Sequence, residues 1–223
     1  MLPYVILHMG VSVDGRIDWG LAPDSPYYDL VPLFNADTDL SGSVTMLTGL
    51  TEEDPAIAFA GIYEEWINKP FRPLLAVVDS RGQLKRWGTL KRQPWWRDHV
   101  ALCSESTPKS HLAYLDEQQV QYIIAGEDRV DLRCALEELN ARYGTRLVRV
   151  DSGGILNGVL LRAGLVDEVS VLINPSLVGG TSPRTMFVAP DLASEEGAIP
   201  LTLTHMEKIK DRFVWLRYQV NKV

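Results

Sequence analysis

Cysteine is scarce in this sequence, and its scarcity excludes two classes of protein. Cys103 and Cys134 are the only cysteines among 223 residues. Two are too few for a disulfide framework, and their spacing is not that of zinc ligands. The four histidines are scattered along the chain, so we predict no metal site. A reducing compartment fits this composition, and we expect a cytoplasmic protein.

Positive charge and long apolar runs are also lacking. The chain carries 22 Lys and Arg against 29 Asp and Glu, a formal net charge of −7. This balance disfavours binding to nucleic acid or to an anionic membrane surface. No apolar run approaches the ~18 residues of a membrane span, and no basic leader precedes the apolar N-terminus. We therefore expect no nucleic-acid partner and no membrane partner.

Residues 85–97 are a local exception to the acidic composition. They interleave lysine and arginine with Trp87, Trp95 and Trp96, a composition that can stack on single-stranded nucleic acid. Because the whole chain is acidic, a solvated loop or a subunit contact is the better interpretation. Tryptophans of this kind could anchor a dimer interface.

Short β-branched or apolar runs are present throughout the chain and predict strands. They cover residues 4–9, 44–47, 74–79, 100–103, 122–125, 147–151, 169–173, 201–204 and 213–220. Helical patterns lie between several of them, which predicts an α/β protein with a mixed, mostly parallel sheet. The last two runs have no helix-length connection and predict a C-terminal antiparallel hairpin. The length suits one domain over residues 1–223.

The helical patterns are of unequal strength. In residues 131–143, Leu132, Ala135, Leu136, Leu139 and Tyr143 fall on one face. A second helix should run from Gly154 to a stop at Gly164, with Ile155, Val159 and Leu160 on its apolar face. A third pattern covers residues 55–67, where proline suits the first helical position. Residues 23–34 and 178–200 lack periodicity and are expected to be loops.

The most informative stretch is residues 147–158, in which a predicted strand runs into Gly153 and Gly154 and then into a helix. Glycines let a ligand approach the backbone closely, and a helix N-terminus favours an anion such as a pyrophosphate. The glycine spacing is not that of the G-x-G-x-x-G dinucleotide motif. An ordinary tight turn explains the pattern equally well.

Two further loops leave predicted strands at the ends where α/β sheets bind ligands. One carries Ser12, Asp14 and Gly15, and the other carries Ser80 and Arg81. Arg81 could meet the 2′-phosphate that distinguishes NADPH from NADH. Taken singly, the first is also readable as an Asp-Gly turn and the second as a generic polar turn.

Taken in order, these segments resemble the reductase domain of the bacterial riboflavin-biosynthesis deaminase-reductase and its stand-alone relatives. The resemblance is carried by residues 12–16, 48–55, 77–80, 153–158 and 161–168. It implies a dihydrofolate-reductase-like three-layer sandwich, a homodimer, and NADPH as the cofactor. It also implies hydride transfer to a small heterocyclic metabolite, as in 5-amino-6-(5-phosphoribosylamino)uracil reductase.

The same resemblance implies roles for individual residues. The dinucleotide would be lined by Gly10, Ser12, Thr48, Ser80, Arg81, Gly153, Gly154, Ile155 and Leu156. Ser25, Tyr27 and Asp151 would contact the substrate, Asp151 standing where the family usually has glutamate. Asp14 and Asp151 are the candidates for polarising or orienting the substrate. Either can instead be a structural carboxylate that satisfies loop amides.

One departure from the family concerns the substrate. Members that act on the ribosylaminopyrimidine phosphate carry arginines before the second strand and after the Asp-Pro motif. The corresponding residues 29–40 and 56–61 contain neither arginine nor lysine. Two alternatives therefore stay open: a pterin reductase of the dihydrofolate type, and a non-catalytic nucleotide-binding protein on the same fold.

Overall fold

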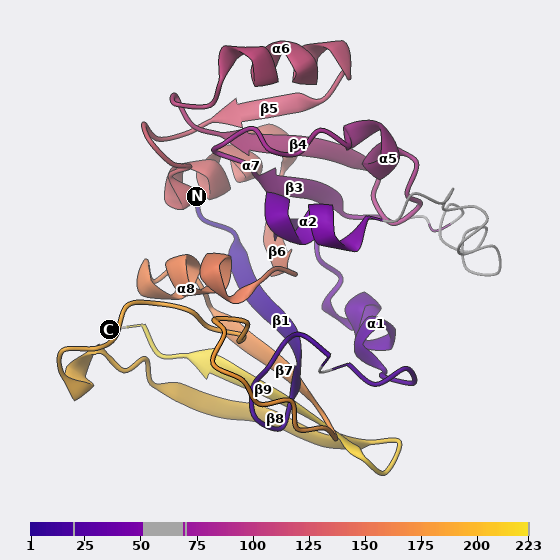
Figure 1. Cartoon of the computed structure of the whole chain (residues 1–223), viewed down its shortest axis with the longest axis vertical. Coiled ribbons are helices and arrows are strands. Elements are labelled where there is room, and N and C mark those ends of the chain that lie inside the picture. Colours follow the sequence, from indigo (N-terminus) through magenta and orange to yellow (C-terminus); the bar gives the residue numbers. More distant parts are fainter. Residues whose placement is uncertain (20, 51–68, 70, 223) are drawn as a thin grey trace. The chain divides into compact units, whose positions relative to one another are not determined.

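The structure, a computed structural model, describes residues 1–19, 21–50, 69 and 71–222 (Figure 1). The chain divides into two compact units, each described here by itself. Unit 1 comprises Met1–Pro3 and Asp37–Arg146, and unit 2 comprises Tyr4–Ala36 and Leu147–Val223. The helix predicted over residues 55–67 and the arginine-free stretch 56–61 lie outside the described residues. That the chain is one domain stays a prediction.

Unit 1 is built on parallel strands. They lie side by side in the order β5 (Gln121–Ile124), β4 (Asp98–Cys103), β3 (Leu74–Val78), β2 (Thr38–Gly42). The helices among the described residues of this unit are α2 (Ser43–Gly49), α5 (Trp87–Lys91), α6 (Lys109–Glu117) and α7 (Leu132–Tyr143). Strands buried on both faces of a parallel sheet read as continuous apolar runs, as Leu74–Val78 does.

The core of unit 1 includes a tryptophan that the sequence analysis placed elsewhere. Trp87 is fully buried with Leu75, Leu84 and Leu115, and Trp96 packs against the same cluster. The prediction of a solvated loop or subunit contact is therefore wrong for Trp87. The cause is α5, which places Trp87 three residues before Leu90 and so buries both on one face.

Unit 2 has a mixed sheet. Its strand order is β6 (Leu147–Val150), β1 (Tyr4–Ser12), β7 (Glu168–Asn174), β9 (Phe213–Val220), β8 (Leu201–Ile209). β1 is parallel to β6 and β7, whereas β7, β9 and β8 pair antiparallel. The predicted α/β class, with mostly parallel strands and an antiparallel C-terminal hairpin, is confirmed.

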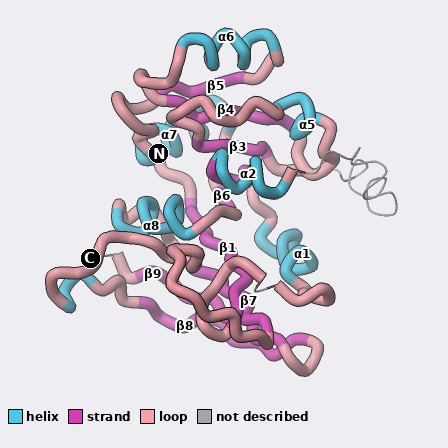
Figure 2. The backbone as a smooth tube through the Cα atoms, viewed as in Figure 1, coloured by secondary structure: helices cyan, strands magenta, loops and turns pink. Residues whose placement is uncertain are grey.

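The helices of unit 2 are few and short. They are α1 (Tyr27–Leu30), the 3₁₀ helix η1 (Val31–Phe34), α8 (Gly154–Arg162) and the 3₁₀ helix η2 (Glu195–Gly197). Residues 23–34, expected to be loop, thus contain α1 and η1. Figure 2 shows the long connection between β7 and β8 almost entirely as loop, as predicted for residues 178–200.

One predicted strand is wrong. Residues 44–47 belong to α2, and the strand lies just before them, over Thr38–Gly42. A four-residue apolar run does not distinguish a strand from a buried helix. The true strand escaped notice because it carries Asp39 and Ser41, both buried. Asp39 is satisfied there by Trp96, whose Nε1 donates to its Oδ2 at 2.9 Å.

Helix α8 begins and ends close to the predicted residues, and Leu160, one of the three residues of its predicted apolar face, is fully buried. Gly164, just past its end, has the expected positive φ of 65°. Ile155 and Val159, predicted to be its apolar face, are 67% and 48% exposed. A side chain at Gly154 or Gly158 would overlap the backbone oxygens of residues 185 and 188. The helix therefore packs through its glycines against the β7–β8 connection.

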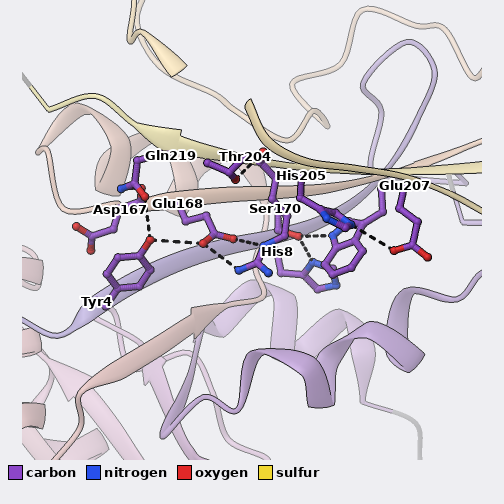
Figure 3. Close-up of polar contacts among 11 residues, drawn as sticks. Tyr4, His8, Asp167, Glu168, Ser170, Thr204, His205, Glu207 and Gln219 are labelled. Atoms are coloured by element: carbon purple, nitrogen blue, oxygen red, sulfur yellow. Dashed lines mark hydrogen bonds and ion pairs between the residues drawn. The ribbon is translucent and has the colours of Figure 1, made fainter. Parts of the chain in front are cut away.

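A buried polar chain crosses β1, β7 and β9 in unit 2 (Figure 3). Trp215 Nε1 donates to Ser170 Oγ at 2.8 Å, and Ser170 Oγ lies 3.0 Å from His8 Nδ1. The other ring nitrogen, Nε2, lies 3.4 Å from the carbonyl oxygen of Tyr27. In a neutral ring protonated at Nε2, every member bonds, because Nε2 donates to the carbonyl and the Ser170 hydroxyl donates to Nδ1. Burial lowers the pKa of His8 to about 3.

We expect acid to destabilise the protein through His8. The unfolded chain protonates this imidazole below pH ~6.5, whereas the folded chain excludes the proton until about pH 3, so stability is lost as pH falls below ~6.5. At pH 5 the loss is about 2 kcal/mol of unfolding free energy. Urea unfolding at pH 7 and pH 5 measures it.

The matched variants are His8→Gln and His205→Gln, the second changing an imidazole that is 40% exposed. The first should reduce the pH dependence and the second should keep it. His99, whose pKa burial lowers to about 4, contributes a slope of similar size between pH 7 and pH 5, and both variants keep it. An undiminished slope in His8→Gln would contradict the assignment.

Candidate functional site

The predicted site residues are distributed over both units. Unit 2 holds Gly10, Ser12, Asp14, Ser25, Tyr27, Asp151, Gly153, Gly154, Ile155 and Leu156, and unit 1 holds Thr48, Ser80 and Arg81. In unit 2, the parallel strands β1, β6 and β7 end at one edge of the sheet. Ligands of α/β proteins bind at such edges.

Asp151 directly follows β6 and is held by a buried arginine. Its Oδ2 lies 3.1 Å from Nη1 of Arg149, and the two side chains are 35% and 6% exposed. Burial, and after it the negative charge of Asp151, raise the pKa of both Tyr27 and Tyr28. The structure thus brings the predicted substrate residues Tyr27 and Asp151 together, with a carboxylate still open to solvent.

Arg149 was missed by the sequence analysis. It lies within β6 between Val148 and Val150, both fully buried. Side chains alternate across a strand, so Arg149 lies on the face of the sheet opposite these valines. The available signal was a single charged residue inside an otherwise β-branched run, because charged side chains are rarely buried unless paired.

The loop that carries Ser25 and Tyr27 lies over β1. Tyr27 donates its hydroxyl to the carbonyl oxygen of His8 at 2.9 Å, and the two rings stack at 4.5 Å. A side chain at Gly10 would overlap Leu21 and meet the Tyr27 ring at 3.0 Å. Gly10 therefore permits this loop to approach the strand. The Ser25 hydroxyl is buried without a hydrogen-bond partner in the described part of the chain.

The contacts of Asp14 are those of a structural carboxylate that accepts hydrogen bonds from loop amides. Its carboxylate accepts hydrogen bonds from Ser12 Oγ at 2.6 Å, Val178 N at 3.0 Å and Gly179 N at 2.6 Å. These donors lower the pKa of Asp14 to about 2, and the hydrogen bond from the Ser12 hydroxyl has the largest effect. A carboxylate of this kind is ionised at neutral pH and has no proton to give.

The residues that follow Asp14 hold the same connection between β7 and β8. Arg16 donates from Nη1 to the carbonyl oxygen of Ser182 at 2.7 Å and from Nη2 to its hydroxyl at 2.6 Å. Asp18 pairs with Arg184 at 2.9 Å. Asp14, Arg16 and Asp18 thus each bind a different part of residues 178–184.

The Gly153–Leu156 segment forms the start of α8. Gly153 is the N-cap, with an extended backbone at φ −77° and ψ 165°. The N–H groups of the first helical turn, at Gly154, Ile155 and Leu156, have no acceptor inside the helix. Together with the helix dipole they favour an anion. At this end of the helix the side chain of Ile155 is exposed, whereas Gly154 is buried.

The predicted cofactor residues of unit 1 have local partners. Thr48, in α2, donates its hydroxyl to the carbonyl oxygen of Val44 at 2.9 Å. Ser80, after β3, accepts from the amide of Val130 at 3.0 Å through its hydroxyl and from Thr107 Oγ1 at 2.9 Å through its carbonyl. Arg81 is exposed beside it. Ser80 therefore joins the ends of β3, β4 and β5.

Neither a metal cluster nor a membrane span is present in the described part of the chain. No three His, Cys, Asp or Glu side chains among residues 1–19, 21–50, 69 and 71–222 are grouped to hold an ion. Among the same residues, every helix is too short or too polar to cross a bilayer.

Known proteins with related sequences share one family. The family described as the RibD C-terminal domain matches residues 3–215. The 2,5-diamino-6-ribosylamino-4(3H)-pyrimidinone 5′-phosphate reductase of Methanothermobacter thermautotrophicus is 30% identical over 206 residues, 91% of this chain and 92% of that protein. The reductase of the same name from Archaeoglobus fulgidus is 29% identical over 197 residues, 83% and 86% of the two chains.

Solved structures show the same fold. RibD of Acinetobacter baumannii superposes with a TM-score of 0.70 at 20% identity, covering 99% of this chain. This chain spans 58% of that RibD chain. The riboflavin biosynthesis reductase of Saccharomyces cerevisiae gives a TM-score of 0.67 at 21% identity, covering 99% of this chain and 90% of the yeast chain.

We expect Asp14→Asn to loosen the β7–β8 connection, because a neutral amide accepts weaker hydrogen bonds from Val178 and Gly179. Hydrogen exchange should be faster at those two amides by about tenfold or more. Asp191→Asn, which changes an exposed carboxylate of the same connection, is the control and should leave both amides protected. Unchanged exchange in Asp14→Asn would instead point to a role on the substrate.

Proposed function

The chain belongs to the RibD C-terminal domain family, and we propose that it is an NADPH-dependent reductase of a ribosylaminopyrimidinone 5′-phosphate. The family predicted from the sequence is confirmed. The curated relatives named as reductases agree with the predicted oxidoreductase class. The cofactor and the substrate are the parts that we propose.

One observation carries the proposal: a single connection holds a candidate substrate group and a candidate cofactor group. Asp151 stands at the end of β6, and the first turn of α8 begins at Gly154, three residues later. A carboxylate and a set of N–H groups without an acceptor inside the helix, so close in the chain, suit two different ligands. The first accepts hydrogen bonds from a substrate, and the second binds an anion.

The donor set at α8 suits the pyrophosphate of a dinucleotide. Backbone N–H groups and a helix dipole bind phosphate oxygens without a fixed side chain. When bound there, NADPH supplies the hydride, and the protein supplies binding and orientation. The roles of Gly10, Ser12, Thr48, Ser80 and Arg81 as cofactor contacts stay predictions.

The groups beside Asp151 suit a polar heterocycle. The substrate named for the curated relatives carries amino groups, which are hydrogen-bond donors that a carboxylate accepts. Arg149 holds the Asp151 carboxylate in place, and Tyr27 and Ser25 come from the loop over β1. We assign Asp151 to orienting the substrate and Asp14 to holding the β7–β8 connection.

The remaining sequence-based expectations are the homodimer and the cytoplasmic location, and both stay predictions. The pterin reductase and the non-catalytic nucleotide-binding protein differ from the proposal in measurable ways. Turnover of a dihydropterin in preference to the pyrimidinone would identify the first. Nucleotide binding by the wild type without oxidation of NADPH by any pterin or pyrimidine would identify the second.

The cofactor site can be tested at Ile155 without disturbing the fold. An acidic residue in the first turn of a helix is favourable for the helix but repels a pyrophosphate. We expect Ile155→Asp to keep or slightly raise the melting temperature and to weaken NADPH binding by tenfold or more. Ile155→Asn is the uncharged control and should bind NADPH nearly as well as the wild type.

Tryptophan fluorescence quenching measures the affinity, and thermal unfolding measures the stability. Equal NADPH affinity in the aspartate and asparagine variants would refute a pyrophosphate at this helix end. Variants at Gly154 are unsuitable, because any side chain there overlaps the backbone at Thr185.

The role of Asp151 predicts a loss of turnover with unchanged cofactor affinity. Asp151→Asn replaces an acceptor by a group that is partly a donor, so kcat/KM for the pyrimidinone phosphate should fall by tenfold or more. Asp151→Glu keeps the carboxylate and should keep most of the activity. The two variants should bind NADPH like the wild type, and equal activity in both would show that the charge is not required.

A further inference from the structure

Three side chains stand in a row beside the loop that follows β3 in unit 1. His111, on α6, is fully buried, and its Nε2 lies 3.4 Å from Oδ2 of the buried Asp79. On the other side of the ring, Nδ1 lies 2.8 Å from Nζ of Lys85. The proposed function so far uses none of these residues.

The protons in this row have one consistent arrangement. A lysine ammonium can only donate, so Nδ1 of His111 must accept from Lys85. The remaining ring proton then sits on Nε2, which lies near Asp79 Oδ2 but makes no hydrogen bond within the described residues. Burial, as the largest effect, lowers the pKa of His111, which agrees with a neutral ring. Lys85 is thus anchored by a neutral acceptor.

A second residue of α6 fixes the position of Lys85. Its Nζ lies 4.8 Å from the centroid of the Tyr114 ring, a distance at which a cation is attracted to the ring face. The Tyr114 hydroxyl in turn donates to the carbonyl oxygen of Lys85 at 2.6 Å. Within the described residues no carboxylate pairs with this ammonium, and one anchoring bond leaves two N–H groups for a ligand. The result is an exposed cation in a fixed place.

The anchor of Lys85 also supports the loop that carries Ser80 and Arg81. Gly82 has a positive φ of 63°, and a side chain there would meet the His111 ring at 2.6 Å. Asp79 closes the same turn by accepting from the amides of Gln83 and Leu84, each at 2.9 Å. The turn and the ammonium therefore share one buried imidazole, and their relative positions are set by it.

We propose that Lys85 binds a phosphate monoester, namely the one on the adenosine ribose of the cofactor, and so makes the enzyme prefer NADPH to NADH. This assignment rests on the proposed function. An ammonium held by a carboxylate would be largely neutralised, whereas one held by a neutral imidazole keeps its charge for an anion. His111 and Asp79 are positioning residues, since they reach the ligand only through Lys85.

The experiment compares two ligands that differ by one phosphate. Calorimetry measures the binding of adenosine 2′,5′-bisphosphate and of adenosine 5′-monophosphate to the full chain, beside NADPH and NADH. Lys85→Gln should reduce the preference for the phosphorylated ligand by about tenfold or more, as expected for a lost charge-assisted bond. Lys91→Gln removes the same charge from an exposed lysine of the same segment, bonded to Gln118, and should change nothing.

The positioning role is tested at His111. His111→Phe keeps a ring against Gly82 but removes the acceptor, so the preference should fall while the affinity for NADH stays. His111→Asn, whose side-chain oxygen can accept from Lys85, should restore part of the preference. A merely structural histidine would affect both dinucleotides equally.

The outcomes separate this assignment from the proposed function. If the wild type binds dinucleotides but does not distinguish the two adenosine ligands, or if Lys85→Gln distinguishes them as well as the wild type, the assignment is wrong and the reductase proposal stands. If the wild type binds neither NADPH nor NADH, the reductase proposal fails and the assignment falls with it.

Discussion

The parallel pairing of β1 with β6 and β7 is the constraint on which unit 2 depends. Val5–Ser12 are all buried, so a shift of this strand by one residue would move every side chain to the opposite face of the sheet and disrupt the packing on both faces. The register places Ile6 opposite both Arg149 and Glu168. It also brings the loops after β1 and β6 to one edge, and with them Asp14 and Asp151. Both the polar chain through His8 and the candidate substrate group follow from it.

The partners of a charged side chain separate structural charges from candidate binding groups in this protein. Arg217 is held by two bonds to Glu168, one of them 3.0 Å long, and Asp14 is surrounded by three donors. Such groups have little capacity left for a ligand. Asp151 and Lys85 differ, because each is anchored on one side and open to solvent on the other. Anchored but open charges are what a binding site requires, since their ordering cost is met during folding.

The glycines at the start of α8 show how packing and ligand binding can share one motif. Gly154 and Gly158 are required by the backbone of the β7–β8 connection, which leaves no room for a side chain. That connection is fixed in turn by Asp14, Arg16 and Asp18 from the loop after β1. The first turn of the helix therefore exists because a distant segment supports its other face. The glycine motif that suggested a ligand site is therefore also required for packing against the β7–β8 connection.

The sequence by itself determined the α/β class, the C-terminal hairpin, the helix over Leu132–Tyr143 and the family, because these depend on periodicity and on short local motifs. Only the tertiary structure decided that residues 44–47 are helical, that Trp87 is in the core and that Ile155 is exposed. It alone showed Arg149 behind Asp151 and Lys85 against His111. Burial and pairing join residues far apart in the chain, and a local pattern carries no information about a partner that only folding brings near.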